Sequence, residues 1–294
     1  MLELSRLVRF SIPLASLRAG GPPVRPAADD PLGGRHNSFA AWPSTDGVGV
    51  FCQWQVRCRG EADPRTGYLV GIAEIDAAVR GHAIDAVAAM LRDDPGAEPA
   101  AILAAVLPRL DAALDGRLHD LTWYLTPWHR VRLEHRRMDR FEIRQQFDFA
   151  AAHHLRSPEL DEEANRRVFG KCTNAHGHNY RLEVAVSVPM PPAGEPAVIG
   201  LRQLEQLVDR HVVERLDHTD LNELEEVFAG NLPSVENIAR ACHRLLAGAV
   251  AEAGGRLSQV TVWETEKTSC TYPSSPIEDA ADPSAAAIPA AAEA

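Results

Sequence analysis

Two histidines separated by one residue, His176 and His178, stand at the start of an alternating segment, residues 172–188. Alternate residues of a strand point to the same face, so both imidazoles could bind one metal ion. A third histidine, His153 or His154, follows an apolar strand in FDFAAAHHL. Three neutral imidazoles on zinc leave one coordination position open, as catalytic zinc sites do. Taken alone, the spaced pair is equally compatible with two histidines at a polar strand end.

Cys172 lies four residues before His176, and three roles for its side chain are open from spacing alone. It could be a fourth zinc ligand, which would close the site and make it structural. It could instead be a thiolate that acts as base or nucleophile beside the cation and a histidine. A buried, inert cysteine is the third possibility.

The segment LDHTDLN places Asp217 next to His218, after a predicted helix. A histidine needs an orienting acceptor to relay protons, and the neighbouring carboxylate could supply it. Adjacent Asp and His residues are also common on protein surfaces, so the pair alone is weak evidence.

Glu264 shares one face of a predicted strand with Val260 and Val262. A carboxylate on an apolar face is unfavourable unless it has a partner. It could accept two parallel hydrogen bonds from a planar pair of N–H groups, such as those of a pterin or guanine-like ring. A salt bridge at the strand end is the alternative.

The elements that would position these residues occur in the same order in both halves of the chain. In each half, strands are predicted from apolar residues at every second position, and helices from apolar residues at helical spacing. The matching segments are residues 44–60 with 172–188, 71–79 with 200–208, and 121–126 with 260–265. With an opening strand before each set, both halves read strand, strand, helix, helix, strand, strand.

The boundary between the halves is predicted near Asp139, within the basic run EHRRMDR. This gives one unit at residues 1–138 and a second at 139–274. The remaining residues, 275–294, are rich in Ala and Pro, contain acidic residues and lack basic ones. A segment with so little apolar bulk cannot offset its ordering entropy, so we predict a disordered tail.

Composition limits the class of protein. The 294 residues include 41 acidic and 30 basic side chains, for a net charge of −11, with 45% apolar and 24% charged residues. These values predict a folded, soluble chain of about two domains, and the acidic balance disfavours nucleic-acid binding. The five cysteines lack CxxC spacing and no apolar run would span a bilayer, so we expect a cytoplasmic protein without a membrane segment.

Five motifs in order, FDFAAAHHL, FGKCTNAHGHNY, LDHTDLN, PSVENIA and WET, make residues 141–272 resemble the 6-pyruvoyl-tetrahydropterin synthase and 6-carboxytetrahydropterin synthase family, of the tunnelling fold. The resemblance implies several site residues. The implied zinc ligands are His153, His176 and His178, since His154 falls where the family has Arg. The implied catalytic groups are Cys172 as base, Asp217 and His218 as its relay, and Glu264 as anchor of the pterin ring, with Glu236 assisting substrate binding.

The resemblance also implies a reaction on a small pterin triphosphate, 7,8-dihydroneopterin triphosphate. Cleavage of the substrate side chain gives 6-carboxy-5,6,7,8-tetrahydropterin, acetaldehyde and triphosphate, whereas internal redox without cleavage gives the pyruvoyl product. The three residues between Cys172 and His176 resemble the bacterial carboxy-product enzymes, which serve 7-deazaguanine and queuosine synthesis. We therefore expect the carboxy product, with the pyruvoyl product as the alternative. A non-catalytic, zinc-stabilised pterin-binding scaffold is less favoured, and a zinc hydrolase is disfavoured because the chain has no HExxH motif.

The first half has lost the residues that carry this chemistry. In the internal alignment Val48 and Val50 replace the paired histidines, Ser44 replaces Cys172, Leu125 replaces Glu264, and Leu14 stands near the third zinc position. We predict an α+β fold of two tandem tunnelling-fold units, each an antiparallel four-stranded sheet with two helices on one face, the first unit lacking a catalytic site. Family members join such units edge to edge into barrels, which implies a homo-oligomer in which the first half covers strand edges.

Overall fold

The computed structural model of the chain describes residues 1–18, 21, 39–45 and 47–275. The predicted disordered tail, apart from Ser275, lies outside the described residues. Among the described helices, none combines the length and apolar character needed to cross a membrane.

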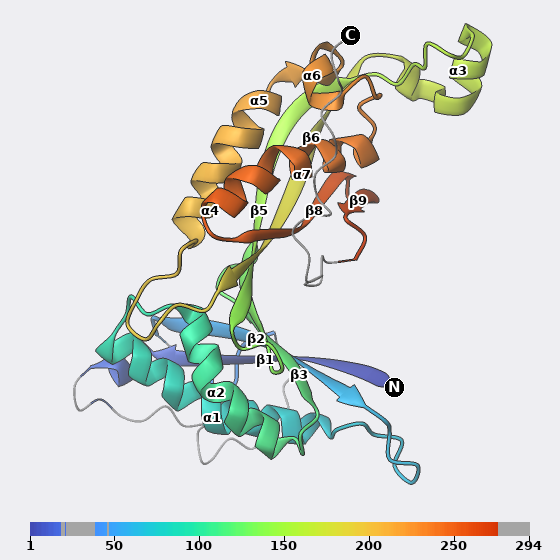
Figure 1. Cartoon of the computed structure of the whole chain (residues 1–294). Helices are drawn as coiled ribbons and strands as arrows, with labels where there is room; N and C mark the ends of the chain where they lie inside the picture. Colours follow the sequence, from blue (N-terminus) through green and yellow to red (C-terminus); the bar gives the residue numbers. More distant parts are fainter. Residues whose placement is uncertain (19–20, 22–38, 46, 276–294) are drawn as a thin grey trace.

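Among its described residues, the first half contains four strands and two long helices, and Figure 1 shows their arrangement. Their bounds are β1 (Leu2–Pro13), β2 (Gly49–Gly60), α1 (Ile72–Asp93), α2 (Pro99–Ala113), β3 (Leu118–Tyr124) and β4 (His129–Glu134). The helix predicted over residues 71–79 is thus only the beginning of α1.

The second half repeats this order with additional short elements. Its strands are β5 (Arg140–His153), β6 (His176–Pro189), β7 (Thr219–Asp220), β8 (Arg256–Thr265) and β9 (Thr268–Tyr272). Its helices are α3 (Glu162–Phe169), α4 (Leu201–Val208), α5 (Glu214–Leu216), α6 (Glu225–Phe228) and α7 (Val235–Glu252), with a 3-10 turn, η2 (Gly170–Thr173), before β6.

One sheet runs through both halves of the described chain. The strand order is β1-β2-β3-β4-β5-β6-β8-β9, each neighbouring pair is antiparallel, and the short β7 pairs in parallel with β5. The α+β arrangement predicted from the sequence is therefore present. The two groups of four strands are not separate sheets, however, because β4 pairs with β5 from His129 opposite Gln145 to Arg132 opposite Glu142. The origin of the halves by tandem duplication stays a prediction.

The alternating pattern gives the sheet one apolar and one polar face. In β6 the predicted alternation is confirmed, since Tyr180, Leu182, Val184, Val186 and Val188 are all fully buried. Helices cover the apolar face of each half, with α1 and α2 on the first half and α4 and α7 on the second (Figure 1).

On the polar face, a buried carboxylate ties the two halves together. Glu183 of β6 accepts hydrogen bonds from Arg130 of β4 at 2.8 Å, from Arg144 of β5 at 3.2 Å and from Gln146 at 3.1 Å. Burial alone would lower the pKa of Arg144, but the carboxylates of Glu142 and Glu183 raise it overall. All three bonds converge on a side chain that is only 6% exposed.

Replacing this carboxylate should weaken the junction. We expect Glu183→Ala to lower the free energy of unfolding by about 3 kcal/mol, because it leaves two partly buried guanidinium groups without their shared acceptor. Urea or thermal unfolding measures the change. Glu162→Ala removes an exposed pair with Arg166, so it should cost at most about 0.5 kcal/mol. Equal effects of the two substitutions would contradict this role for Glu183.

Candidate metal centre and active site

Three histidines meet at the end of the β5–β6 pair. His153 lies opposite His176, and His178 lies opposite Ala151, two residues along on the same face. The imidazole nitrogens that could bind a metal all lie within 4.8 Å of one another. Gly177 separates the pair, and a Cβ there would come within 3.2 Å of the Ala151 carbonyl oxygen. The structure therefore brings His153, rather than His154, to His176 and His178.

Backbone carbonyls orient two of the three rings. The Nδ1 atom of His153 lies 2.8 Å from the carbonyl oxygen of Pro233, and that of His176 lies 2.8 Å from the carbonyl oxygen of Asn174. A carbonyl only accepts, so the ring proton belongs on Nδ1 and the lone pair on Nε2. This is the tautomer in which a histidine binds metal through Nε2.

The chemistry of this donor set fits a metal ion. The Nε2 atoms of His153 and His178 are buried and have no hydrogen-bond partner among the described residues. Burial is the main cause that lowers the pKa of both residues, so both favour the neutral, metal-binding form. Three neutral imidazoles suit zinc and neighbouring transition metals.

Glu264, near the end of β8, lies against this cluster. Its Oε1 atom is 3.5 Å from Nε2 of His153 and 3.8 Å from Nε2 of His178, and the side chain is 21% exposed. A carboxylate and a possible cation site thus share one partly open space, where a ligand ring and a metal could be held together.

Tyr180 is a residue of this region that sequence reasoning assigned only to the core. Its ring stacks on Phe149 and contacts the rings of His153 and His178, and its hydroxyl is buried without a partner among the described residues. Burial, followed by the charges of Glu264 and Cys172, raises its pKa. The sequence signal that could have placed Tyr180 in the site is its spacing, because it follows His176 and His178 at every second position and so shares their strand face.

Cys172 lies in η2, the turn that leads into β6, and is partly buried. Its backbone carbonyl accepts a hydrogen bond of 2.8 Å from Leu155, just after β5. Its charge contributes to the raised pKa of Tyr180. The turn therefore brings the thiol within electrostatic reach of that hydroxyl.

Asp217 and His218 form a tight pair anchored on β5. Asp217 accepts from the backbone N–H of Ala150 at 2.7 Å, and its other oxygen lies 2.7 Å from Nδ1 of His218. His218 has a φ of +56°, a left-handed conformation that is strained for a non-glycine residue, and its side chain is 82% exposed. Between this pair and Cys172, no hydrogen bond or ion pair occurs in the part of the chain that the structure describes.

A shallow cavity of about 550 Å³ in front of His218 is lined by residues of β5, β6 and β7, among them His178 of the histidine cluster and Ala151 opposite it. The other β5 and β6 residues of the lining, Ala150, Ala152, Gly177 and Asn179, alternate with His153, His176 and Tyr180, so most of this cavity faces the other side of the sheet. Within one chain, the Asp217–His218 pair and the histidine cluster thus lie mainly on opposite faces.

Glu236 is exposed in the first turn of α7. A hydrogen bond with the Ser234 side chain is the main cause that lowers its pKa, and its charge helps raise the pKa of Cys270, after burial. Its neighbours are therefore Ser234, just before α7, and Cys270 of β9, at the edge of the sheet.

Comparison with known proteins identifies the second half. The family model described as 6-pyruvoyl tetrahydropterin synthase matches residues 142–275. The human 6-pyruvoyl tetrahydrobiopterin synthase is 32% identical over 133 residues, which cover 45% of this chain and 90% of the human protein. The chain belongs to the 6-pyruvoyl tetrahydropterin synthase family. All eight site residues predicted from the sequence lie within the matched range.

Other relatives carry two different names. The Drosophila melanogaster 6-pyruvoyl tetrahydrobiopterin synthase is 38% identical over 93 residues, 31% of this chain and 55% of that protein. The Haemophilus influenzae 6-carboxy-5,6,7,8-tetrahydropterin synthase is 27% identical over 151 residues, 45% of this chain and 98% of that protein. The solved structure of the Caenorhabditis elegans 6-pyruvoyl tetrahydropterin synthase is 30% identical, covers 45% of this chain and 94% of its own, and has a TM-score of 0.41.

The Asp217–His218 contact can be tested by carbon-detected NMR titration. The Ala150 N–H, and after it His218, lowers the pKa of Asp217. The carboxyl should therefore titrate below its ordinary value, and the stabilisation it contributes should be lost as the pH falls through that lowered value. His218→Ala should raise the pKa of Asp217 only part of the way, because the bond from Ala150 remains. An unchanged titration in the variant would contradict this pairing.

Proposed function

We propose that this chain is a zinc-dependent pterin synthase that converts 7,8-dihydroneopterin triphosphate and water to 6-carboxy-5,6,7,8-tetrahydropterin, with release of triphosphate and acetaldehyde. The observation that carries the proposal is the convergence of three imidazoles, two of which, His153 and His176, have their Nδ1 protons held by backbone carbonyls. His153, His176 and His178 would hold the metal. When bound, zinc would supply Lewis-acid chemistry toward the hydroxyl groups of the substrate side chain.

The protein's own groups would then bind the ring and move protons. The Glu264 carboxylate would accept two hydrogen bonds from N–H groups of the pterin ring, and these bonds would fix the ring beside the histidines. Cys172 as thiolate would take a proton from a side-chain carbon of the bound substrate and return it to the pterin ring. Glu236 would assist substrate binding from the edge of the sheet.

Asp217 and His218 would relay the second proton. Asp217 holds the Nδ1 proton of His218, which leaves Nε2 free to accept or donate at the substrate. Because this pair lies mainly on the other face from the histidine cluster of its own chain, we infer that His218 completes the site of a second copy. The enzyme would then act as a homo-oligomer.

The choice of product rests on a small difference. The three residues between Cys172 and His176 favour the carboxy product, and the relative from Haemophilus influenzae carries that name. The names of the human and Drosophila relatives favour 6-pyruvoyl tetrahydropterin synthase activity as the second candidate. All five cysteines are free, which supports a reducing compartment, the cytoplasm.

We infer that the first half is a copy of the second that lost its chemistry. The Leu14 N–H donates to the Val48 carbonyl at 3.2 Å, so Leu14 and Val48 face each other as His153 and His176 do. Both side chains are aliphatic and at least 44% exposed. This position in the first half therefore offers no metal ligand.

Metal binding tests the role of the histidines. We expect the purified chain to hold one zinc ion per copy, and His176→Ala to lose most of it, because two imidazoles bind far more weakly than three. Elemental analysis after dialysis measures the ratio. His154→Ala, a change at the adjacent histidine outside the cluster, should keep its zinc, and loss of zinc from this control alone would overturn the assignment.

Turnover tests the role of Cys172 and the product together. With dihydroneopterin triphosphate, the zinc enzyme should yield acetaldehyde and the carboxy pterin by mass analysis. Cys172→Ala should keep zinc and lose at least about 10²-fold in kcat, whereas Cys270→Ala should remain active. Pyruvoyl product without acetaldehyde would replace the proposed product by the second candidate. Absence of both products from zinc-loaded protein would overturn the enzyme assignment.

A further inference from the structure

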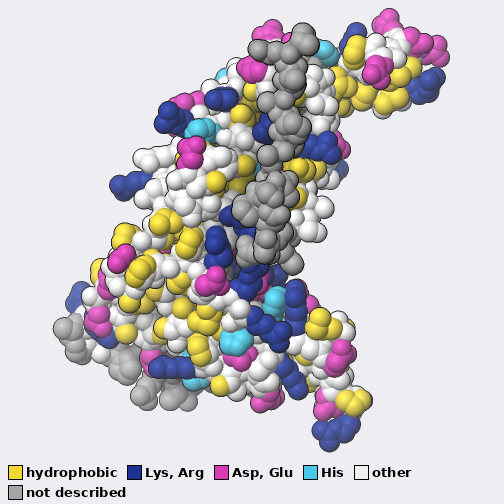
Figure 2. Space-filling view, in the orientation of Figure 1, with side chains coloured by type: hydrophobic (Ala, Val, Ile, Leu, Met, Phe, Trp, Pro, Cys, Tyr) yellow, Lys and Arg dark blue, Asp and Glu magenta, His cyan; other side chains and the backbone are white. Residues whose placement is uncertain are grey.

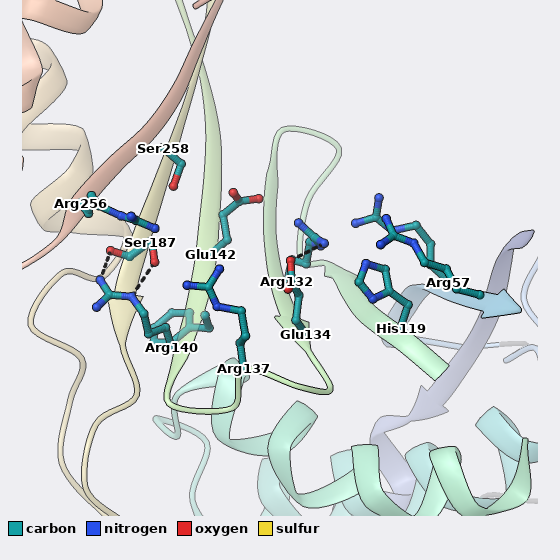
Figure 3. Close-up of a pocket in the computed structure, with 12 residues that line it drawn as sticks. Arg57, His119, Arg132, Glu134, Arg137, Arg140, Glu142, Ser187, Arg256 and Ser258 are labelled. Carbon is teal, nitrogen blue, oxygen red and sulfur yellow. Dashed lines mark hydrogen bonds and ion pairs between the residues drawn. The ribbon is translucent and has the colours of Figure 1, made fainter. Parts of the chain in front are cut away.

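A second cavity, of about 350 Å³, lies where the two halves meet, on the polar face of the sheet (Figure 3). It is lined mainly by arginines: Arg57, Arg59, His119, Arg132, Glu134, Arg137, Arg140, Phe141, Glu142, Ser187, Arg256 and Ser258. We call it the arginine pocket. The space-filling view shows Lys and Arg side chains gathered at this junction, next to His side chains (Figure 2).

The register of the sheet builds this pocket from six strands. In the second half Glu142 of β5 lies opposite Ser187 of β6, which lies opposite Arg256 of β8. Across the junction, Glu142 lies opposite Arg132 of β4. Two residues along β4, a second row on the same face runs from Glu134 through Asp120 of β3 to Arg57 of β2, so side chains far apart in the sequence line one cavity.

The pocket is strongly positive in a chain that is acidic. Six arginines against two glutamates leave a formal excess of four positive charges on the lining, whereas the whole chain carries −11. Both glutamates are already engaged, Glu134 by Arg132 and Glu142 by Arg144. They therefore repel an incoming anion less than free carboxylates would.

The arginines of the two halves differ in their partners. Arg57 and Arg132 share the buried carboxylate of Asp120, and Arg59 pairs with Glu3. These contacts hold that side of the pocket in place.

Arg140 instead donates to the uncharged Ser187, to Oγ at 2.8 Å and to the carbonyl at 3.4 Å. Burial, and then the charges of Arg140 and Arg137, lowers the pKa of Arg256. Arg140 and Arg137 thus repel Arg256 across this side of the pocket, and a bound anion would relieve that repulsion.

We propose that the arginine pocket binds a polyphosphate chain. Guanidinium groups bind phosphate oxygens in pairs, and several of them around one cavity match several linked phosphates better than a single carboxylate. The volume lies within the range of small-ligand sites. Two sources share this chemistry, namely inorganic triphosphate, which the proposed reaction releases, and a nucleoside triphosphate.

This site is separate from the histidine cluster of the same chain. Arg140 begins β5 and His153 ends it, which at about 3.3 Å per residue places them roughly 40 Å apart. One small ligand cannot reach both. None of the residues that line the pocket is a proposed catalytic or metal-binding residue. Binding in the pocket can therefore be measured independently of turnover.

Calorimetric titration of the full chain tests the proposal. We expect inorganic tripolyphosphate to bind, inorganic phosphate to bind at least tenfold more weakly, and affinity to fall as salt rises. Arg140→Gln, and separately Arg137→Gln on the turn between β4 and β5, should weaken tripolyphosphate binding at least tenfold. Arg9→Gln is the matched control, since Arg9 lies on the same sheet and donates to an uncharged side chain, Gln53, and it should bind like the unmodified chain.

The outcomes separate this proposal from the proposed function. Binding that persists in His176→Ala supports a site away from the metal centre, whereas binding lost in His176→Ala and kept in both arginine variants would overturn the proposal. Equal affinity for phosphate and tripolyphosphate would also overturn it. If GTP binds at least tenfold more tightly than tripolyphosphate, the ligand of the pocket is a nucleoside triphosphate. If the two bind equally, the pocket recognises the phosphate chain alone. Thermal unfolding confirms that each variant is folded.

Discussion

Antiparallel pairing of β4 with β5 is the contact on which the architecture depends. Without it, each half would present an open strand edge, with unpaired N–H and C=O groups that invite aggregation. The pairing converts two sets of four strands into one continuous sheet among the described residues. It also brings Arg130 of the first half to Glu183 of the second, so backbone pairing and a buried ionic contact act at the same place.

Register is the corresponding constraint on the candidate active site. A slip of one residue between β5 and β6 would turn His153 to the face opposite His176, because side chains alternate along a strand. The long pairing, from Arg140 opposite Pro189 to His153 opposite His176, prevents such a slip. Carbonyls of Pro233 and Asn174, from outside the strand pair, then select the ring tautomers. The sheet positions the histidines, and the segments beside it determine which ring nitrogen of His153 and His176 carries the proton.

The same strand therefore carries different chemistry at its two ends. At the end of β5, three imidazoles and Glu264 form a compact cluster suited to a metal and a planar ring. At its beginning, Arg140 joins arginines from both halves around a cavity suited to anions. The first half thus contributes arginines to the cavity at the junction even though Leu14 and Val48 offer no metal ligand.

The sequence by itself determined the strands and the main chemical residues. Alternation from Tyr180 to Val188 identified β6 and its buried face, and the spacing of His176 and His178 identified two groups on one side of it, because these features depend only on neighbouring residues. Only the tertiary structure decided that β4 pairs with β5, that His218 lies mainly across the sheet from the histidine cluster, and that Arg57, Arg140 and Arg256 line one pocket. The physical reason is that periodicity encodes which face a side chain takes, whereas the order and register of strands determine which side chains meet there.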